Sequence, residues 1–306
     1  MKRVLVTGAT GFIGRQSLAP LLKRGFHVTA VTSRDPIPAP TEVQWLHADL
    51  MDSRQVRSVM ETVRPTHLLH MAWYATPGHF WTSQENFRWV KASLDLLDEF
   101  ARNGGQRIVT AGTCAEYEWT HGCCVEDQTP LRPTTTYGVC KGAFQAMQSA
   151  YCRKAGLSSA WGRIFFLYGP YEHPKRLVSS VILSLLRGEP ALCSHGRQIR
   201  DFLHVADVGD AFAALLASDV EGAVNIASGQ PVTLRHVAET MARLLGRETS
   251  LQFGAVAAPN DPPLLLADTR RLREEVAWSP RFDLDAGLSD TIAWWQRKTQ
   301  EEGITS

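Results

Sequence analysis

Tyr137 and Lys141 stand four residues apart, and this pair is the first pattern in the chain that could carry chemistry. On a helix this spacing places both side chains on one face, one turn apart. An ammonium group beside a phenol stabilises the phenolate and lowers the tyrosine pKa from its ordinary value of about 10. The phenol can then serve as a general acid or base near neutral pH. Ordinary surface helices show the same spacing, so the pair alone leaves both interpretations open.

A second candidate is the hydroxyl of Thr113, which follows an apolar run at residues 107–111 that predicts a buried strand. In a doubly wound sheet the carboxyl ends of the strands line the ligand crevice. A hydroxyl at that edge can bond to a substrate oxygen, although a plain turn after a strand also uses threonine.

Three glycines, Gly8, Gly11 and Gly14, follow the apolar residues 4–6 at intervals of three. Glycine permits positive φ and leaves no Cβ between the backbone and a phosphate. The first N–H groups of a helix at residues 15–24 would then face that phosphate. The stretch predicts a dinucleotide pyrophosphate cradle; a glycine-rich turn without a ligand is the alternative.

The rest of the chain must supply the elements that position these residues. Apolar runs predict strands at residues 3–6, 27–32, 43–46, 66–71, 107–111, 159–166, 200–205, 223–227 and 250–253. Helical patterns, the first with Asp52 as its cap, cover residues 53–63, 86–103, 136–155, 177–187, 206–217, 231–245, 268–277 and 283–298.

This alternation predicts an α/β fold, a Rossmann-type doubly wound parallel sheet with a smaller C-terminal substrate lobe. We expect residues 1–168 to form the dinucleotide-binding domain, which also receives segments from about 200–228. Residues 169–306 would form mainly the substrate-binding lobe, which is then discontinuous.

Composition excludes several classes. The 306 residues are 44% apolar and 21% charged with a net charge of +1, which gives no electrostatic case for nucleic acid or a membrane surface. No apolar run approaches the roughly 20 residues of a membrane span. The six cysteines show no C-x-x-C pair or metal-ligand rhythm, so we expect free thiols and no metal. A strand entered directly from the N-terminus predicts no signal peptide and a cytoplasmic protein.

Taken together and in order, these motifs resemble the extended short-chain dehydrogenase/reductase family, in its nucleotide-sugar epimerase/dehydratase branch. The resemblance covers almost the whole chain. The matching segments are residues 7–14, 49–50, 70–72, 111–113, 137–141, 163–170 and 200–205.

The resemblance implies site residues. Thr113, Tyr137 and Lys141 would form the catalytic triad. The residues implied in cofactor binding are Gly8, Gly11, Phe12, Ile13 and Gly14 at the pyrophosphate, Asp49 and Leu50 at the adenine, Met71 and Ala72 along the cofactor, and Tyr137 and Lys141 at the nicotinamide ribose. The residues implied in substrate binding are Trp73, His79, Trp81, Phe166, Arg176 and Arg200.

Two of these implied roles have alternatives. Arg200 would hold the nucleotide-sugar diphosphate, because a guanidinium binds phosphate oxygens bidentately. It could equally pair with Asp201 or Asp207. The aromatic loop from Trp73 to Trp81 could stack on a base or sugar, or could close the two lobes together.

Departures from the family pattern reduce the number of reactions that the resemblance implies. Similar 4,6-dehydratases carry an Asp-Glu pair directly after the catalytic threonine, where this chain has Cys114 and Ala115. Neither residue can act as that acid/base pair, so we expect no dehydration. Phe166 stands where many members place a substrate-binding asparagine, so the diphosphate contacts must differ.

The end of the second strand bears on the cofactor. Thr32, Ser33 and Arg34 can bind a 2′-phosphate, which favours NADP, whereas Asp35 could instead take the ribose of NAD. Our first expectation is NADPH-dependent reduction of a nucleotide-linked 4-keto-6-deoxy sugar. The alternatives are an NAD-dependent 4-epimerase and, from another class, a non-catalytic dinucleotide-sensing protein. We also expect a homodimer that pairs the helices at 86–103 and 136–155.

Overall fold

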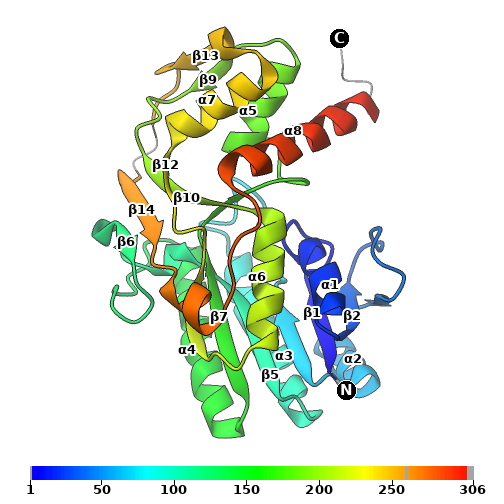
Figure 1. The fold of residues 1–306 in the computed structure, drawn as a ribbon. Coiled ribbons are helices and arrows are strands. Elements are labelled where there is room, and N and C mark those ends of the chain that lie inside the picture. Colours follow the sequence, from blue (N-terminus) through cyan, green and yellow to red (C-terminus); the bar gives the residue numbers. More distant parts are fainter. Residues whose placement is uncertain (1, 259–260, 302–306) are drawn as a thin grey trace.

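The computed structural model describes residues 2–258 and 261–301, drawn in Figure 1. Its centre is a seven-stranded sheet in the order β11-β7-β5-β4-β1-β2-β3, and every recorded pairing between these strands is parallel. The strands are β1 (Arg3–Thr7), β2 (His27–Thr32), β3 (Gln44–His47), β4 (His67–His70), β5 (Arg107–Thr113), β7 (Ser158–Ile164) and β11 (Gly222–Ile226). The predicted α/β class and parallel sheet are confirmed.

Helices cover both faces of this sheet, because its central strands are apolar on both sides. In β1, the side chains of Val4 and Val6 enter one core and that of Leu5 enters the other. The first core lies under α1 (Gly14–Lys23) and α6 (Val205–Ala217), which contact each other. The second lies under α2 (Ser53–Val63), α3 (Glu85–Arg102) and α4 (Thr136–Ala155).

A smaller lobe sits at the end of the molecule away from the N-terminus (Figure 1). Its helices α5 (Leu177–Leu186), α7 (Leu234–Leu245) and α8 (Leu284–Glu301) share one apolar core. Its strands are β6 (Cys123–Cys124), β8 (Phe166–Tyr168), β10 (Ile199–His204), β12 (Pro231–Thr233) and β14 (Leu264–Ala267), with the separate pair β9 (Ala191–Cys193) and β13 (Leu251–Phe253).

One stack of side chains links this lobe to the glycine-rich turn. The guanidinium of Arg15 lies 3.8 Å from the ring centroid of Tyr171 and also donates to the carbonyls of Thr10 and Gly11. Tyr171 packs on Trp294 of α8, with 4.8 Å between ring centroids. The backbone of Tyr171 has φ of +72°, a left-handed conformation that is unfavourable for a non-glycine residue.

Three predicted elements differ from the structure. The strand at 159–166 breaks at Phe165, because residues 166–168 leave the main sheet to pair with β10. The helix at 231–245 starts only at Leu234, since Pro231–Thr233 pairs with β10 and Thr233 caps the helix. The helix at 268–277 shrinks to a π-helical turn, Arg271–Glu275, because Asp268 still bonds to Cys124 as a continuation of β14.

Three further findings concern the described residues alone. None of their helices is long and apolar enough to cross a membrane. The same part of the chain contains no group of three or more His, Cys, Asp or Glu side chains arranged to hold a metal ion. The six cysteines are free thiols, and Cys123 is the exposed one.

Candidate active site at the carboxyl ends of the strands

The glycine-rich turn forms a tight backbone cradle between β1 and α1. Gly8 has φ of +68°, and a Cβ there would lie 2.7 Å from the backbone nitrogen of Ala72. A Cβ on Gly14 would lie 2.2 Å from the carbonyl oxygen of Gly8. Within the described chain no side chain caps the first turn of α1, which begins after Ile13. The dipole of such a helix start favours an anion, although the N–H groups of Arg15 and Gln16 already donate to the carbonyls of Gly11 and Ile13.

Gly11 and Phe12 form the outer rim of this cradle. The N–H of Gly11 donates to the carbonyl of Gly8 at 2.9 Å, which closes the turn. Gly11 is exposed, whereas Phe12 and Ile13 are half-buried beside it. The five residues predicted at the pyrophosphate therefore share one turn of backbone.

Thr7, the last residue of β1, holds the neighbouring loop against the cradle. Its hydroxyl oxygen accepts hydrogen bonds from the backbone N–H groups of Met71 and Ala72, both at 3.2 Å. These two residues directly follow β4, and the backbone of Ala72 abuts Gly8. The structure therefore brings the predicted cofactor residues Met71 and Ala72 next to the cradle.

His70 is the buried neighbour of this arrangement. Its Nδ1 bonds to the hydroxyl of Thr7 at 2.7 Å, and its Nε2 bonds to that of Ser93 at 2.8 Å. Burial, with a smaller contribution from the charge of Lys141, lowers the pKa of His70 to about 3. The ring is therefore neutral at physiological pH, and its two hydrogen bonds link β4 to β1 and to α3.

The end of β2 presents two of its three predicted residues to solvent. Ser33 and Arg34 are exposed, as is Asp35. Thr32 is buried, and its hydroxyl donates to the carbonyl of Arg34 at 3.2 Å while accepting from the N–H of the same residue at 3.0 Å. The Thr32 hydroxyl is thus engaged in the turn itself, and its predicted contact with a phosphate stays a prediction.

Asp49 and Leu50 follow β3 in a short turn before α2. The Asp49 side chain is exposed and accepts from the N–H of Met51 at 2.9 Å, and its own N–H donates to Gln55 at 2.9 Å. Leu50 is buried in the core beneath α2. These hydrogen bonds define the turn and leave the Asp49 side chain at its surface.

Thr113, Tyr137 and Lys141 meet at the carboxyl end of β5. Thr135 starts α4 by accepting a hydrogen bond from the N–H of Gly138, so Tyr137 falls in its first turn and Lys141 one turn later. The hydroxyl of Thr113 accepts from the N–H of Ala115 at 3.2 Å and lowers the pKa of the neighbouring Tyr137. Lys141 is buried and donates to the carbonyl of Ala111 in β5 at 2.8 Å.

The electrostatics of this trio differ from the sequence-based expectation. Burial raises the pKa of Tyr137, and Thr113 opposes this rise only in part. Burial also lowers the pKa of Lys141 to about 7, against the opposing charge of Glu116. The expectation that lysine lowers the tyrosine pKa is wrong here, because loss of solvation dominates. The phenol is protonated at neutral pH.

Glu116 is a residue of the site that sequence reasoning missed. It lies fully buried behind Thr113 and accepts from the backbone N–H of Thr113 at 2.8 Å and from Nε1 of Trp161 at 3.0 Å. Nε of Arg163, also buried, donates to Glu116 at 2.8 Å, and Arg163 donates to the hydroxyl of Tyr117 at 2.9 Å. Thr113 followed three residues later by a glutamate is a capping-box pattern, and that signal could have revealed the contact.

The aromatic loop packs on α4. The carbonyl of Trp81 accepts from the backbone N–H of Tyr137 at 3.1 Å. The rings of Phe80 and Trp81 meet the Tyr137 ring edge-on, with centroids 4.9 and 5.7 Å away. Trp73 also contacts α4, and His79 is exposed on the loop. These contacts tie the loop to Tyr137, and the ring of Phe80 contributes to them together with that of Trp81.

Arg200 lies buried in β10 with its guanidinium 5.3 Å from the ring centroid of Phe166. Its Nη2 lies 3.7 Å from Asp261, a half-exposed carboxylate. The alternative pairing with Asp201 or Asp207 is wrong, because backbone N–H groups elsewhere engage both carboxylates.

Arg176 is exposed just before α5, and its charge acts on the pKa of two other groups. It lowers the pKa of Tyr137 and that of Glu172, although burial outweighs it in both cases. Glu172 is buried, accepts from the Ser179 hydroxyl at 2.9 Å, and has its pKa raised to about 7. Arg176 therefore stands on the side of the smaller lobe that faces the tyrosine.

Cys114 and Ala115, which follow Thr113, are both buried in a short 3₁₀ turn. Burial raises the pKa of the Cys114 thiol, so it stays neutral. Neither side chain is a carboxylate, which agrees with the expectation of no dehydration. That expectation stays a prediction.

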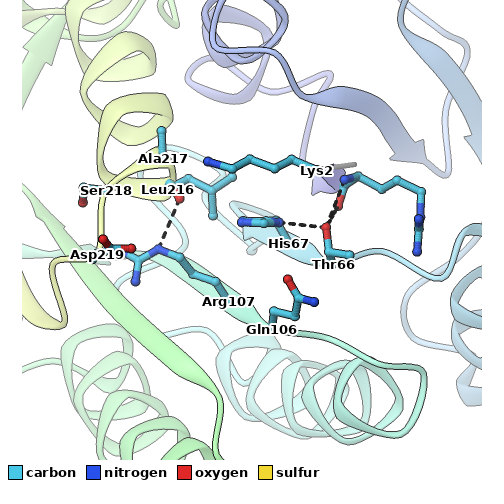
Figure 2. A pocket seen from close by; sticks show the side chains of 10 residues that line it. Lys2, Thr66, His67, Gln106, Arg107, Leu216, Ala217, Ser218 and Asp219 are labelled. Atoms are coloured by element: carbon cyan, nitrogen blue, oxygen red, sulfur yellow. Dashed lines mark hydrogen bonds between the residues drawn. The ribbon is translucent and has the colours of Figure 1, made fainter.

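A hollow of about 380 Å³ opens at the opposite, amino-terminal edge of the sheet (Figure 2). Arg107 lies in it and donates to the carbonyls of Leu215, Leu216 and Val220 at the end of α6. A cation there satisfies the terminal carbonyls of a helix. His67 shares the hollow, and burial, with Lys2 and Arg107, lowers its pKa to about 4. The lining includes none of the predicted site residues.

Comparison with known proteins decides the family. The profile of the NAD dependent epimerase/dehydratase family matches residues 4–227. This chain belongs to that family. It is thus an enzyme of the extended short-chain dehydrogenase/reductase type, as the ordered motifs indicated.

Individual relatives cover nearly the whole chain. UDP-glucuronic acid decarboxylase 1 of Xenopus tropicalis is 26% identical over 98% of this chain and 74% of its own length. UDP-glucose 4-epimerase of Azospirillum brasilense is 27% identical over 98% of this chain and 93% of its own. The solved structure of MoeE5 in complex with UDP-glucuronic acid and NAD is 31% identical, with a TM-score of 0.82 over 97% of this chain and 99% of that one.

Proposed function

We propose that the enzyme reduces the 4-keto group of a nucleotide-linked 4-keto-6-deoxy sugar with NADPH, a step of deoxysugar biosynthesis. The observation that carries this proposal is the meeting of Thr113, Tyr137 and Lys141 at the carboxyl edge of the sheet, where burial keeps the phenol protonated. Carbonyl reduction needs a proton donor at this point. Elimination of water would need the carboxylate pair that Cys114 and Ala115 replace.

A dinucleotide fits the cradle of residues 8–14. The missing Cβ atoms of Gly8 and Gly14 leave the backbone open to close approach, and the uncapped start of α1 favours a pyrophosphate. When bound, the nicotinamide supplies the hydride. Solved relatives that carry NAD support a dinucleotide in this family.

The side chains would divide the proton chemistry. Tyr137 donates its phenolic proton to the substrate oxygen as negative charge develops there. Lys141 stabilises the phenolate that remains, since a buried anion without a cation is costly. Thr113 gives the substrate oxygen a second hydrogen bond, and Glu116 fixes Thr113 through its backbone N–H.

The preference for NADPH rests on the end of β2. Ser33 and Arg34 are exposed there, and a guanidinium suits the 2′-phosphate that distinguishes NADPH from NADH. Arg34→Ala should therefore weaken NADPH binding and leave NADH binding unchanged.

The second candidate is an NAD-dependent nucleotide-sugar 4-epimerase. Asp35 is exposed next to Arg34 and can accept hydrogen bonds from the ribose hydroxyls of NAD. Relatives named UDP-glucose 4-epimerase and neighbours solved with NAD favour this reading. An epimerase retains its cofactor and returns the hydride to the sugar, so it consumes none.

One experiment separates the two. The purified protein is denatured and the released nucleotide is identified by mass spectrometry. Fresh protein is then incubated with a panel of 4-keto-6-deoxy and parent sugar nucleotides, with NADPH or NADH. Stoichiometric oxidation of NADPH supports the reductase. Retained NAD with interconversion of two sugar nucleotides, and no net oxidation, would establish the epimerase.

We propose that the substrate diphosphate lies near Arg200 and Arg176, with the sugar beside Trp81 and Phe166. In the same proposal residues 1–168, with segments from about 200–228, hold the dinucleotide, and the remainder of 169–306 holds the sugar nucleotide. A non-catalytic sensing role is less well supported, because a sensor has no use for the trio of Thr113, Tyr137 and Lys141.

A homodimer is proposed from an apolar stripe on α4. Val139 and Met147 are exposed large apolar side chains, 48% and 37% accessible, and lie eight residues apart. The exposed residues Ala143, Ala146 and Ala150 continue the same helix face. Phe87, on the adjoining α3, is 59% accessible. Small residues in such a stripe allow close helix packing, and a second copy would bury it.

A further inference from the structure

The ammonium of Lys141 faces an aromatic ring. Its Nζ lies 3.8 Å from the ring centroid of Trp73, close enough for a strong cation–π contact. The same ammonium donates to the carbonyl of Ala111 at 2.8 Å. The catalytic lysine is thus held between a backbone dipole in β5 and an indole from the loop after β4.

The indole of Trp73 is itself fixed. Its Nε1 donates to Oδ1 of Asn86 at 2.8 Å, and the ring stacks between Trp89 of α3 and Phe144 of α4 with centroids 6.3 and 6.4 Å away. Asn86 is fully buried and donates through Nδ2 to the carbonyl of Phe80 at 2.7 Å. One asparagine therefore orients the ring at Lys141 and also anchors the loop that packs on the catalytic tyrosine.

Few charges act on the lysine. Among residues 2–258 and 261–301, the titratable or charged groups that face it are Glu116 behind β5, His70 in β4 and Tyr137 one turn earlier on α4. His70 is neutral, and Tyr137 is protonated. The carboxylate of Glu116 already accepts a hydrogen bond from Nε of Arg163 at 2.8 Å, so its charge is paired. The direct contacts of the ammonium are therefore a carbonyl and a π face, both of which favour its charged form.

We propose that Trp73 is a positioning residue that keeps Lys141 protonated and directed at the proton-transfer site. The inference rests on the proposed role of Lys141 but concerns an interaction inside the protein itself. A side chain without a π face at position 73 would remove a contact that stabilises the charged form of Lys141. Because Lys141 is buried, solvation compensates little for that loss.

The test measures the titration of Lys141 directly. Protein labelled with carbon-13 at lysine Cε is titrated by NMR without added cofactor, and the Lys141 signal is assigned by its loss in Lys141→Met. Trp73→Phe keeps a π face, whereas Trp73→Met keeps a flexible apolar side chain without one. We expect the Lys141 pKa to fall by about one pH unit in Trp73→Met, and by less than half of that in Trp73→Phe.

Trp89→Met is the matched control, since it removes an indole from the same stack with no recorded contact to the ammonium. Its Lys141 pKa should stay close to that of the parent protein. An equal shift in Trp89→Met and Trp73→Met, or no downward shift in Trp73→Met, would overturn the proposal. Thermal unfolding of each variant confirms that the titrated protein is folded.

Activity provides the second readout. In the reductase assay, the alkaline limb of the kcat profile should move to lower pH in Trp73→Met by the same amount as the NMR titration. If the titration shifts and no sugar nucleotide is turned over, the proposed function fails while the contact stands. If turnover occurs and its pH profile is the same in Trp73→Met, the positioning role fails.

Discussion

Tyr137 reaches its position through three contacts. The carbonyl of Trp81 accepts from its backbone N–H, and the rings of Phe80 and Trp81 both meet its own ring edge-on. The sequence pattern indicated the tyrosine and the threonine as candidates, because their order along the chain is specific, and their catalytic role stays a prediction. It could not identify the aromatic contacts, because the loop at residues 71–84 has no periodicity that predicts its path.

Tyr137→Phe preserves the ring contacts and removes the phenolic proton. We expect turnover to fall by about 10²–10⁴-fold, the usual contribution of a general acid. Cofactor affinity, measured by fluorescence titration, should remain near that of the parent protein because the cradle is untouched. Turnover within a factor of two of the parent would exclude Tyr137 as the proton donor.

The glycine cradle shows how one element depends on the absence of a side chain. Its existence was predictable from the spacing of Gly8, Gly11 and Gly14. The contact of Gly8 with Ala72 was not, because it joins β1 to a loop more than sixty residues away. The same holds for the strand predicted at 159–166, which splits because β10 competes for its last residues.

Gly14→Ala would force a Cβ to within 2.2 Å of the Gly8 carbonyl oxygen, so α1 must shift away from the cradle. We expect at least tenfold weaker dinucleotide binding and a loss of about 1–3 kcal/mol in stability. Gly142→Ala is the control, since a Cβ there meets no atom within 4 Å. It should keep cofactor affinity and gain roughly 0.5–1 kcal/mol from helix propensity. Isothermal titration and urea unfolding measure both effects.

Met147→Glu tests the apolar stripe on α4. A carboxylate in the middle of this stripe would be buried without a partner in a dimer that uses α4. We expect the variant to sediment as a monomer at concentrations where the parent protein is dimeric. A parent protein that is monomeric throughout, or a variant that dimerises as well as the parent, would contradict the proposed homodimer.

At the scale of the whole molecule, buried groups with opposite titration behaviour set the response to acid. Burial lowers the pKa of His70 from 6.5 to about 3, so its contribution to stability is present above pH 6.5 and is lost as the pH falls toward 3. Burial raises the pKa of Glu172 from 4.5 to about 7, so its contribution is complete below pH 4.5 and is lost as the pH rises through 7. Over the mildly acidic range the two effects oppose each other.

Removing either group should reveal the effect of the other on the pH dependence of stability. Between about pH 7.5 and pH 5, each group changes the free energy of unfolding by about 2 kcal/mol, with opposite sign. We therefore expect Glu172→Gln to lose more stability than the parent on acidification, and His70→Gln to lose less. Urea unfolding of the three proteins at both pH values provides the measurement. Identical pH dependence in all three would refute this account.

The stack of Arg15 and Tyr171 has a kinetic consequence. It runs from the carbonyls of the glycine turn to Trp294 of α8, so it connects the sheet domain to the smaller lobe beside the cradle. The dwell time of a dinucleotide bound there would depend on how often the contacts of Tyr171 with Arg15 and Trp294 break. Tyr171→Gly removes the ring and also suits the φ of +72°, so it should shorten the dwell time without loss of stability, whereas Tyr171→Phe should preserve it. Stopped-flow displacement of bound dinucleotide measures the two release rates. A slow release step would suit an enzyme that keeps its cofactor through many turnovers, and a fast one an enzyme that exchanges it in each.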